Sequence, residues 1–270
     1  MVLLSDGKKT DFVDRAMLAT LPSPQPKAGS KHHRPVHHYE LVCTIEDKLE
    51  DRGWEISRSD FAMSEDSMKL FFTMNINPVS TALTKLFPDG ALSRMADDGR
   101  GFMLGGRAGN DQSMAIRLCS GSDVMVCDNM ILSGDDFLIH RKHTTEVRLP
   151  ELVAAGIDQL PLEMVRGETG IWAMKDRKLN DDQARLQIYS AFLETSPPVA
   201  TLKYAREVND LYFDSTEKTA PEIAGNSGTM YGLHNSFTRT FKRMSNRNKF
   251  ESSQRLGRFV GLTAETSAAV

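Results

Sequence analysis

The chain of 270 residues lacks the features of a secreted or membrane protein. It has only three cysteines, Cys43, Cys119 and Cys127, with no CxxC pair, so we expect Cys119 and Cys127 to be buried free thiols, as in a reducing compartment. No apolar run approaches the roughly 18 residues of a membrane span. The first four residues lead directly into a polar segment, without the core of a signal peptide. These absences predict a cytoplasmic protein with no membrane partner.

The chain as a whole also lacks a large excess of positive or negative charge. The formal net charge is −3, which gives no global attraction to nucleic acid or to a membrane surface. Any attraction to an anionic partner must therefore come from local clusters of lysine and arginine.

Motifs of established catalytic centres are absent as well. The chain has no HExxH or DxD-type motif, and no Ser-His-Asp or Cys-His arrangement can be argued from it. The glycine-rich segment 105–109 lacks the GK[ST] ending and the following helix of a phosphate loop, so we interpret it as a strand bend or bulge. We expect a binding protein more than an enzyme, although an enzymatic function stays open.

Histidines suggest a metal site, but their spacing argues against one. The candidate ligands are His33 with His38, or His140 with His143, together with Asp128, Asp135 or Asp136. On a strand, His140 and His143 would lie on opposite faces, although they could meet on a turn. We therefore predict neither a metal nor a cofactor, and we expect His33 and His38 to hydrogen-bond the N-terminal segment onto the domain.

Strand signals are densest between residues 101 and 145. Apolar residues alternate with others over 114–119, and short apolar runs follow at 124–127 and 137–139. Turn residues separate them at 120–123 and 133–136. This pattern predicts a three-stranded antiparallel meander, and a hairpin over 54–76 adds to the same sheet.

The complete pattern predicts an α+β protein with a helical C-terminal third. We expect an extended Pro/His-rich arm over 1–38, with a short helix in 11–21, and a sheet core over 39–178 that begins with a helix near residue 38 and has a loop at 77–100. A helix that opens at Leu149 is interrupted by Pro161. Helices then fill 179–262, and 263–270 form a disordered tail.

Two basic clusters are candidate sites for an anionic partner. Arg141, Lys142 and His143 end the last predicted strand, with Arg107 and Arg117 on nearby strands. Arg239, Lys242, Arg243 and Arg247 have the spacing of one helix face, and Lys249 follows them. A solvated surface or a protein partner is the alternative for both clusters. Trp54, Phe102 and Phe137 could stack bases, but we expect them to pack in the core.

Five segments of the chain resemble an uncharacterised family of phage- and plasmid-encoded proteins. They are HRPVHHYELV at 33–42, GGRAGNDQS at 105–113, VCDN at 126–129 with SGD at 133–135, RKHT at 141–144 and YGLHNSFT at 231–238. The resemblance implies a phage, prophage or plasmid setting in a bacterial cytoplasm and brings no established activity. The order of helix, hairpin, meander and helix is also similar to the core of single-strand annealing recombinases, which is an analogy of fold alone.

Two functions of different classes follow. The first is a DNA-metabolism protein that binds single-stranded DNA and anneals strands as a homo-oligomer. The second is an anti-defence protein that binds and blocks a host immunity or restriction complex. A metal-dependent nuclease is a third and weaker possibility.

Overall fold

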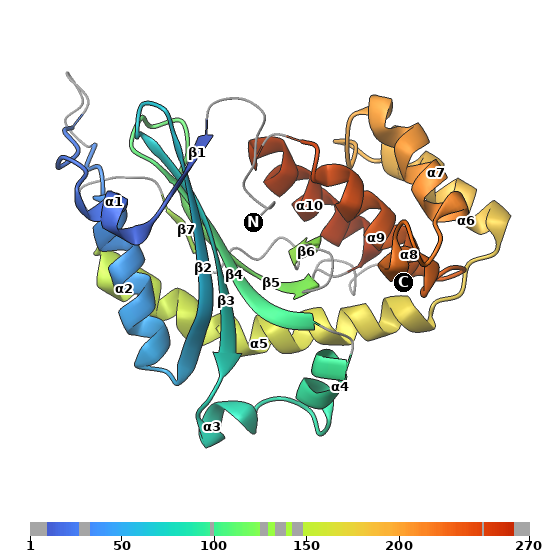
Figure 1. Ribbon diagram of the computed structural model, residues 1–270, viewed down its shortest axis with the longest axis horizontal. Coiled ribbons are helices and arrows are strands. Elements are labelled where there is room, and N and C mark those ends of the chain that lie inside the picture. The colour runs from blue at the N-terminus through green and yellow to red at the C-terminus, as the bar shows by residue number, and fades with distance from the viewer. Residues whose placement is uncertain are drawn as a thin grey trace.

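The computed structural model describes residues 10–26, 33–97, 100–124, 129–132, 139–141, 148–244 and 246–261. Within them the protein is α+β, as the sequence predicts, with one antiparallel sheet followed by helices (Figure 1). The strands are β1 (Thr10–Val13), β2 (Trp54–Ser64), β3 (Lys69–Pro78), β4 (Arg100–Gly109), β5 (Ile116–Val124), β6 (Asn129–Leu132) and β7 (Ile139–Arg141). Strands β1 to β6 are neighbours in chain order, and β7 pairs with the start of β5.

The helices form two groups around this sheet. The first group is α1 (Arg15–Ala19), α2 (His38–Glu50), α3 (Thr81–Thr84), α4 (Ala91–Asp97) and α5 (Leu149–Asp176). The second group is α6 (Asp181–Tyr189), the π-helical turn η1 (Ser190–Glu194), the 3₁₀ turn η2 (Leu202–Tyr204), α7 (Ala205–Asp214), α8 (Pro221–Ala224), α9 (Met230–Phe241) and α10 (Asn246–Val260). Helices α2 and α5 pack against each other and against the sheet.

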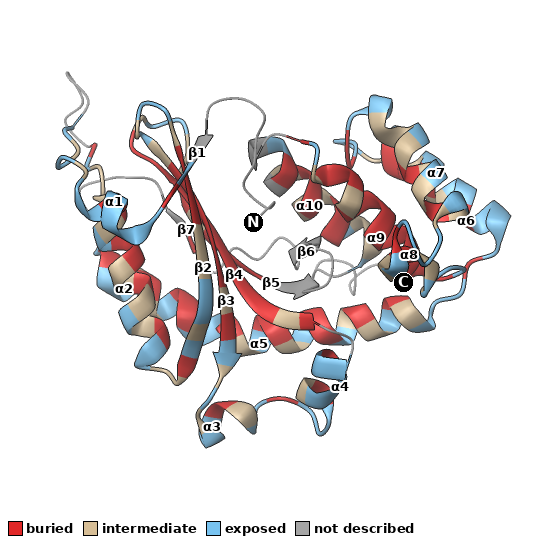
Figure 2. Ribbon diagram, in the orientation of Figure 1, coloured by how far each residue is buried: buried red, intermediate tan, exposed pale blue. Residues whose placement is uncertain are grey.

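Two neighbouring rows of residues across the strands show that the sheet has two different faces. The first row is Val13, Phe61, Phe72, Gly106, Leu118 and Ile139. The second row is Phe12, Ala62, Phe71, Arg107, Arg117 and His140. Directly opposed residues share a face, and successive residues alternate between faces. The first face therefore carries the core, which also includes α2 and α5 (Figure 2), and the second face carries two arginines.

The glycine-rich segment 105–109 belongs to β4, so its predicted bend or bulge is wrong. Strand β4 pairs with β3 and β5 without a register shift. Gly106 leaves room for the Phe72 ring, which a Cβ at this position would overlap. The bulge lies instead in β2 at Ser57, because Ile56 and Arg58 pair with consecutive residues of β3.

Three further expectations need correction. The predicted turn at 120–123 lies inside β5, where β4 and β6 pair with its two edges. The predicted loop 77–100 contains α3 and α4, whose Leu83 and Met95 are buried in the core. Residues 11–13 are in β1, so the N-terminal helix is only α1. Residues 125–128 and 133–138, which carry other predicted strand and turn positions, lie outside the described residues, as does the predicted tail.

Helix α5 connects two hydrophobic cores. Its first part, up to Met164, packs in the core of the sheet, and its last part, from Ile171, packs with the C-terminal helices. Pro161 lies inside this continuous helix, so the predicted interruption is wrong. The neighbouring Leu160 and Met164 are buried, and this packing holds the helix together despite the hydrogen bond that proline cannot donate.

We expect Gly106→Ala to destabilise the protein, because the added methyl group would displace the Phe72 ring in a closely packed sheet. Overpacking of this kind typically costs about 1–3 kcal/mol in the free energy of unfolding. Urea denaturation measures it. Gly101→Ala is the matched control on the same strand, since among described residues no atom lies within 4 Å of a Cβ at Gly101. Equal stability of the two variants would contradict the close packing at Gly106.

Candidate nucleic-acid interface

Two of the predicted cations, Arg107 and Arg117, lie directly opposite each other on β4 and β5. Phe71 is opposite Arg107 on the other side, and the backbone of His140 is opposite Arg117. Arg107 is 6% exposed, and Arg117 is half-buried. The structure thus brings together two predicted residues, on the face of the sheet that α2 and α5 leave uncovered.

Helix α10 lies on the same side of the sheet as these arginines. Burial lowers the pKa of Arg117, and the nearby carboxylate of Glu251 in α10 opposes this shift. Helices α9 and α10 also contact β6, which is paired with β5. Helix α10 and strand β5, far apart in the sequence, therefore lie near each other (Figure 1).

The C-terminal basic residues do not form one helix face, and that prediction is wrong. Helix α9 ends at Phe241, and Arg247 belongs to the next helix, α10. The chain turns here because Phe241 and Met244 are both buried in the second core. Arg239, Lys242, Arg243 and Arg247 consequently span two helices and the turn between them.

Most cations of this segment have structural contacts. Arg239 forms an ion pair with the Glu222 carboxylate at 2.6 Å and donates to the Thr219 carbonyl at 2.8 Å, which fixes α8 to α9. Arg243 pairs with Glu207 at 3.1 Å, but its side chain stays 75% exposed. Lys249 is only 3% exposed.

The remaining predicted site residues are only partly described. The backbone of Arg141 is opposite Ile116, on the core-facing register of β5 and one position out of phase with Arg117. Lys142 and His143 lie outside the described residues, and only the backbone of Arg247 is described.

The aromatic residues Trp54 and Phe102 are packed in the core, which confirms the predicted role. Both are 3% exposed, and their rings meet each other and Phe87. Phe137 is outside the described residues. Cys119 is buried as predicted, and burial raises the pKa of its thiol to about 12, so it is unreactive. Cys127 is outside the described residues.

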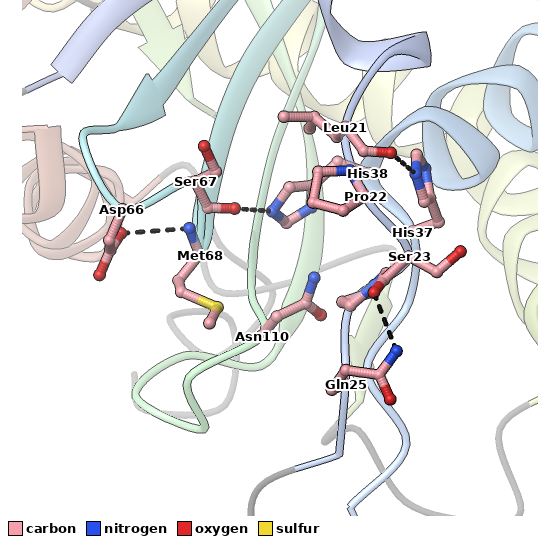
Figure 3. A pocket seen from close by; sticks show the side chains of 11 residues that line it. Leu21, Pro22, Ser23, Gln25, His37, His38, Asp66, Ser67, Met68 and Asn110 are labelled. Atoms are coloured by element: carbon pink, nitrogen blue, oxygen red, sulfur yellow. Dashed lines mark hydrogen bonds between the residues drawn. The ribbon is translucent and has the colours of Figure 1, made fainter.

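A pocket of about 310 Å³ lies between the N-terminal arm and the body of the protein (Figure 3). Leu21 and Pro22 of the arm form part of one wall, and Ser67 and Met68 of the β2–β3 turn form part of the other. Its histidines hold the structure together. His37 Nδ1 accepts from the Tyr39 N–H, so its Nε2–H donates to the Leu21 carbonyl at 3.0 Å.

Of the two predicted anchors, His38 bonds the Ser67 carbonyl at 3.2 Å and joins the end of the arm to the hairpin turn, as predicted. The bond from His37 to Leu21 lies within the arm and was not predicted. Asn110 binds the backbone of Val36 through both amide atoms, at 3.0 and 2.9 Å. Among the described residues, no group of His, Cys, Asp or Glu is arranged to hold a metal ion. Asp128, Asp135 and Asp136 lie outside the described part.

One cluster that the sequence analysis missed surrounds Trp172 of α5. Arg94 of α4 lies with its Cζ 5.4 Å from the centroid of the indole ring, and Lys175 of α5 lies with its Nζ at 4.6 Å. Arg100 of β4 is also near, at 5.9 Å. Trp172 and Lys175 have i, i+3 spacing on a helix, which is visible in the sequence, whereas the approach of α4 is not.

The segment YGLHNSFT at 231–238 forms the buried helix α9. His234 is 2% exposed and stacks on the Tyr231 ring, and Asn235 is fully buried and donates to the Glu222 carbonyl at 3.1 Å. Ser236 donates to the Gly232 carbonyl within the helix. Burial lowers the pKa of His234 to about 4. These polar residues are packed among α5, α7, α8 and α10, so their role is structural.

We expect His234 to make stability depend on pH. An unfolded histidine has a pKa of about 6.5, so between pH 6.5 and pH 4 the unfolded chain binds a proton that the folded chain does not. Stability is then complete above pH 6.5 and falls as the pH drops towards 4, by about 3 kcal/mol from this residue. Denaturant unfolding at several pH values would measure a smaller loss in His234→Gln. The same loss in both proteins would contradict a neutral buried histidine.

No helix in the described part of the chain combines the length and apolar character needed to cross a membrane. No protein-family model, curated protein or solved structure matches the chain.

Proposed function

We propose that the protein binds single-stranded DNA and anneals strands as an oligomer, in a phage or plasmid setting. The observation that carries this proposal is the cross-strand pair Arg107–Arg117 on the sheet face that α10 also borders. Two guanidinium groups on neighbouring positions of one sheet face could together contact one anion. A phosphate group has the charge that such a pair of arginines binds.

The burial of the two arginines determines which of them a phosphate would contact first. Arg117 is half-buried and is reached first, whereas Arg107, at 6% exposed, supports the charge from the neighbouring strand. The Glu251 carboxylate near Arg117 occupies the electrostatic position that a phosphate would take. A phosphate would compete with this electrostatic attraction, and binding would depend strongly on salt.

The row that contains these arginines also favours single strands over duplex. Phe12 and Phe71 occupy the same row, and Phe12 is 42% exposed at the sheet edge. Exposed bases can stack on an aromatic ring, whereas bases in a duplex are already stacked. Helices α2 and α5 pack together on one face of the sheet, an arrangement similar to the core of annealing recombinases. This similarity concerns the fold alone.

A second candidate function is an anti-defence protein that binds a host immunity or restriction complex. It is favoured by an exposed apolar stripe on α6 and η1, formed by Leu186, Tyr189 and Leu193 at 57%, 52% and 53% exposure. These residues follow one another at about one helical turn, which is the pattern of a docking face. The same stripe would serve subunit contacts in an annealing oligomer.

We expect Arg117→Gln to weaken binding of labelled oligothymidylate in fluorescence anisotropy. Loss of one phosphate contact should reduce the slope of log K against log salt by about 0.7. Arg166→Gln is the matched control, because Arg166 is an exposed arginine of α5 that pairs with Glu163 three residues earlier. Thermal unfolding would verify that both variants fold. Equal affinity and equal slope would overturn the role of Arg117, and no binding by the wild type at low salt would overturn the proposed function.

We expect Leu186→Ser with Leu193→Ser to disrupt assembly through the stripe. Mass photometry would show loss of the homo-oligomer if the annealing function is correct, with single-stranded DNA binding retained by the smaller species. Leu86→Ser with Leu162→Ser is the control, since these leucines are equally exposed: Leu86, beside α3, is 58% exposed, and Leu162, on α5, is 54% exposed. In a pull-down from host lysate, the variant could instead fail to retain a stoichiometric host protein that the wild type retains. That result, with no change in oligomer size, would favour the anti-defence function.

A further inference from the structure

Three segments that are distant in sequence meet at Trp172. Helix α4 supplies Arg94, strand β4 supplies Arg100, and α5 supplies Trp172 and Lys175. All three cations lie within 6 Å of the indole centroid, the range in which a cation is attracted to the ring. The cluster lies where α5 passes from the first core to the second, since Met164 belongs to the first and Ile171 to the second.

The three cations differ in the groups that lie next to them. Arg100 is 3% exposed and donates to both carboxylate oxygens of Glu168, at 2.7 and 2.8 Å, so its charge is balanced inside the protein. Arg94 is exposed, and it makes no ion pair with any residue that the structure describes. Lys175 lies over Trp172 and also 5.2 Å from the Tyr231 centroid. Within the described part of the chain, this exposed arginine thus lies close to an aromatic ring and has no carboxylate partner.

Trp172 differs from the other tryptophan of the chain. Trp54 is 3% exposed and packs edge-to-face with Phe87 and Phe102, as a core residue does. Trp172 is only half-buried, and its Nε1–H, although shielded from solvent, has no hydrogen-bond partner among the residues that the structure describes. Buried indole N–H groups usually find a partner. The ring is therefore held by packing and by cations, and part of its surface is accessible.

We propose that Trp172 is a stacking platform for a base of single-stranded DNA, and that the base takes the place of the cations over the ring while Arg94 and Lys175 turn to the phosphates on either side. This inference rests on the proposed function and identifies a second contact for the same strand. A positively charged surface that follows the backbone, combined with an aromatic ring that accepts a base, is the recognition mode of proteins that bind single strands without sequence preference. A free phosphate would use the cations and leave the indole unused.

The chain provides its own spectroscopic probe for this site, because it has only two tryptophans. In the Trp54→Phe variant, all tryptophan emission comes from Trp172. We expect oligothymidylate to quench this emission, with the same midpoint as the anisotropy of a labelled oligothymidylate. Inorganic phosphate alone should cause little quenching. Equal quenching by phosphate would overturn base stacking and reduce the site to an anion site.

Affinity provides the second measurement. We expect Trp172→Ala to weaken binding of oligothymidylate about 5- to 150-fold, which is the loss typical of one stacked base, and Trp172→Phe to weaken it less. Arg94→Gln should lower the salt slope by about 0.7. The matched control is Arg185→Gln, because Arg185 lies over the Phe213 ring at 4.4 Å in a cation–π pair of the C-terminal helices.

The outcomes separate this inference from the proposed function. If the wild type binds single strands and Trp172→Ala and Arg94→Gln leave affinity and salt slope unchanged, the platform is wrong and the function stands. If the wild type does not bind single strands at low salt, both are wrong. Should Trp172→Ala fail to fold, the quenching experiment and the Arg94→Gln salt slope still decide, because both keep the indole ring.

Discussion

The packing of the Phe72 ring on Gly106 determines how the sheet presents its two faces. The ring occupies the space that any larger residue at 106 would need, so β3 and β4 approach closely in one register. A shift of one residue would move every side chain of β4 to the opposite face. The opposition of Arg107 and Arg117 is thus a consequence of the register that Phe72 and Gly106 require.

Helix α5 links the sheet to the C-terminal helices, and an ion pair fixes its position on the sheet. Arg100 begins β4 and forms a buried ion pair with Glu168 of α5, between the two hydrophobic cores. Removing one partner of such a pair typically costs about 3–5 kcal/mol, because the other charge stays buried without compensation. The ion pair therefore fixes where α5 leaves the sheet, and the position of Trp172 one turn later depends on it.

Local patterns in the sequence predicted the elements that local chemistry determines. Helix α2 and the β2–β3 hairpin follow from periodicity, and the structure has them. The regular pairing of β4 through 105–109 is not visible in the sequence, because its glycines favour a bend until Phe72 of another strand fills their space. The basic C-terminal segment was assigned to one helix because spacing alone does not reveal that Phe241 and Met244 turn the chain. The Trp172 cluster needed α4, which lies far away in the sequence and was predicted as loop.

The distribution of charge explains why a count of basic residues is a poor guide to where an anionic partner would bind. Arg239 and Arg100 each face a buried carboxylate, so their charges stabilise the contacts between helices or between helix and sheet. Such paired cations contribute little field outside the protein, because the carboxylate cancels it within a few ångströms. Arg94 is exposed over an indole ring, which attracts the cation through its quadrupole and has no net charge. A cation held in this way keeps its full charge for a partner, and the protein can therefore have a local anion-binding surface at a net charge of −3.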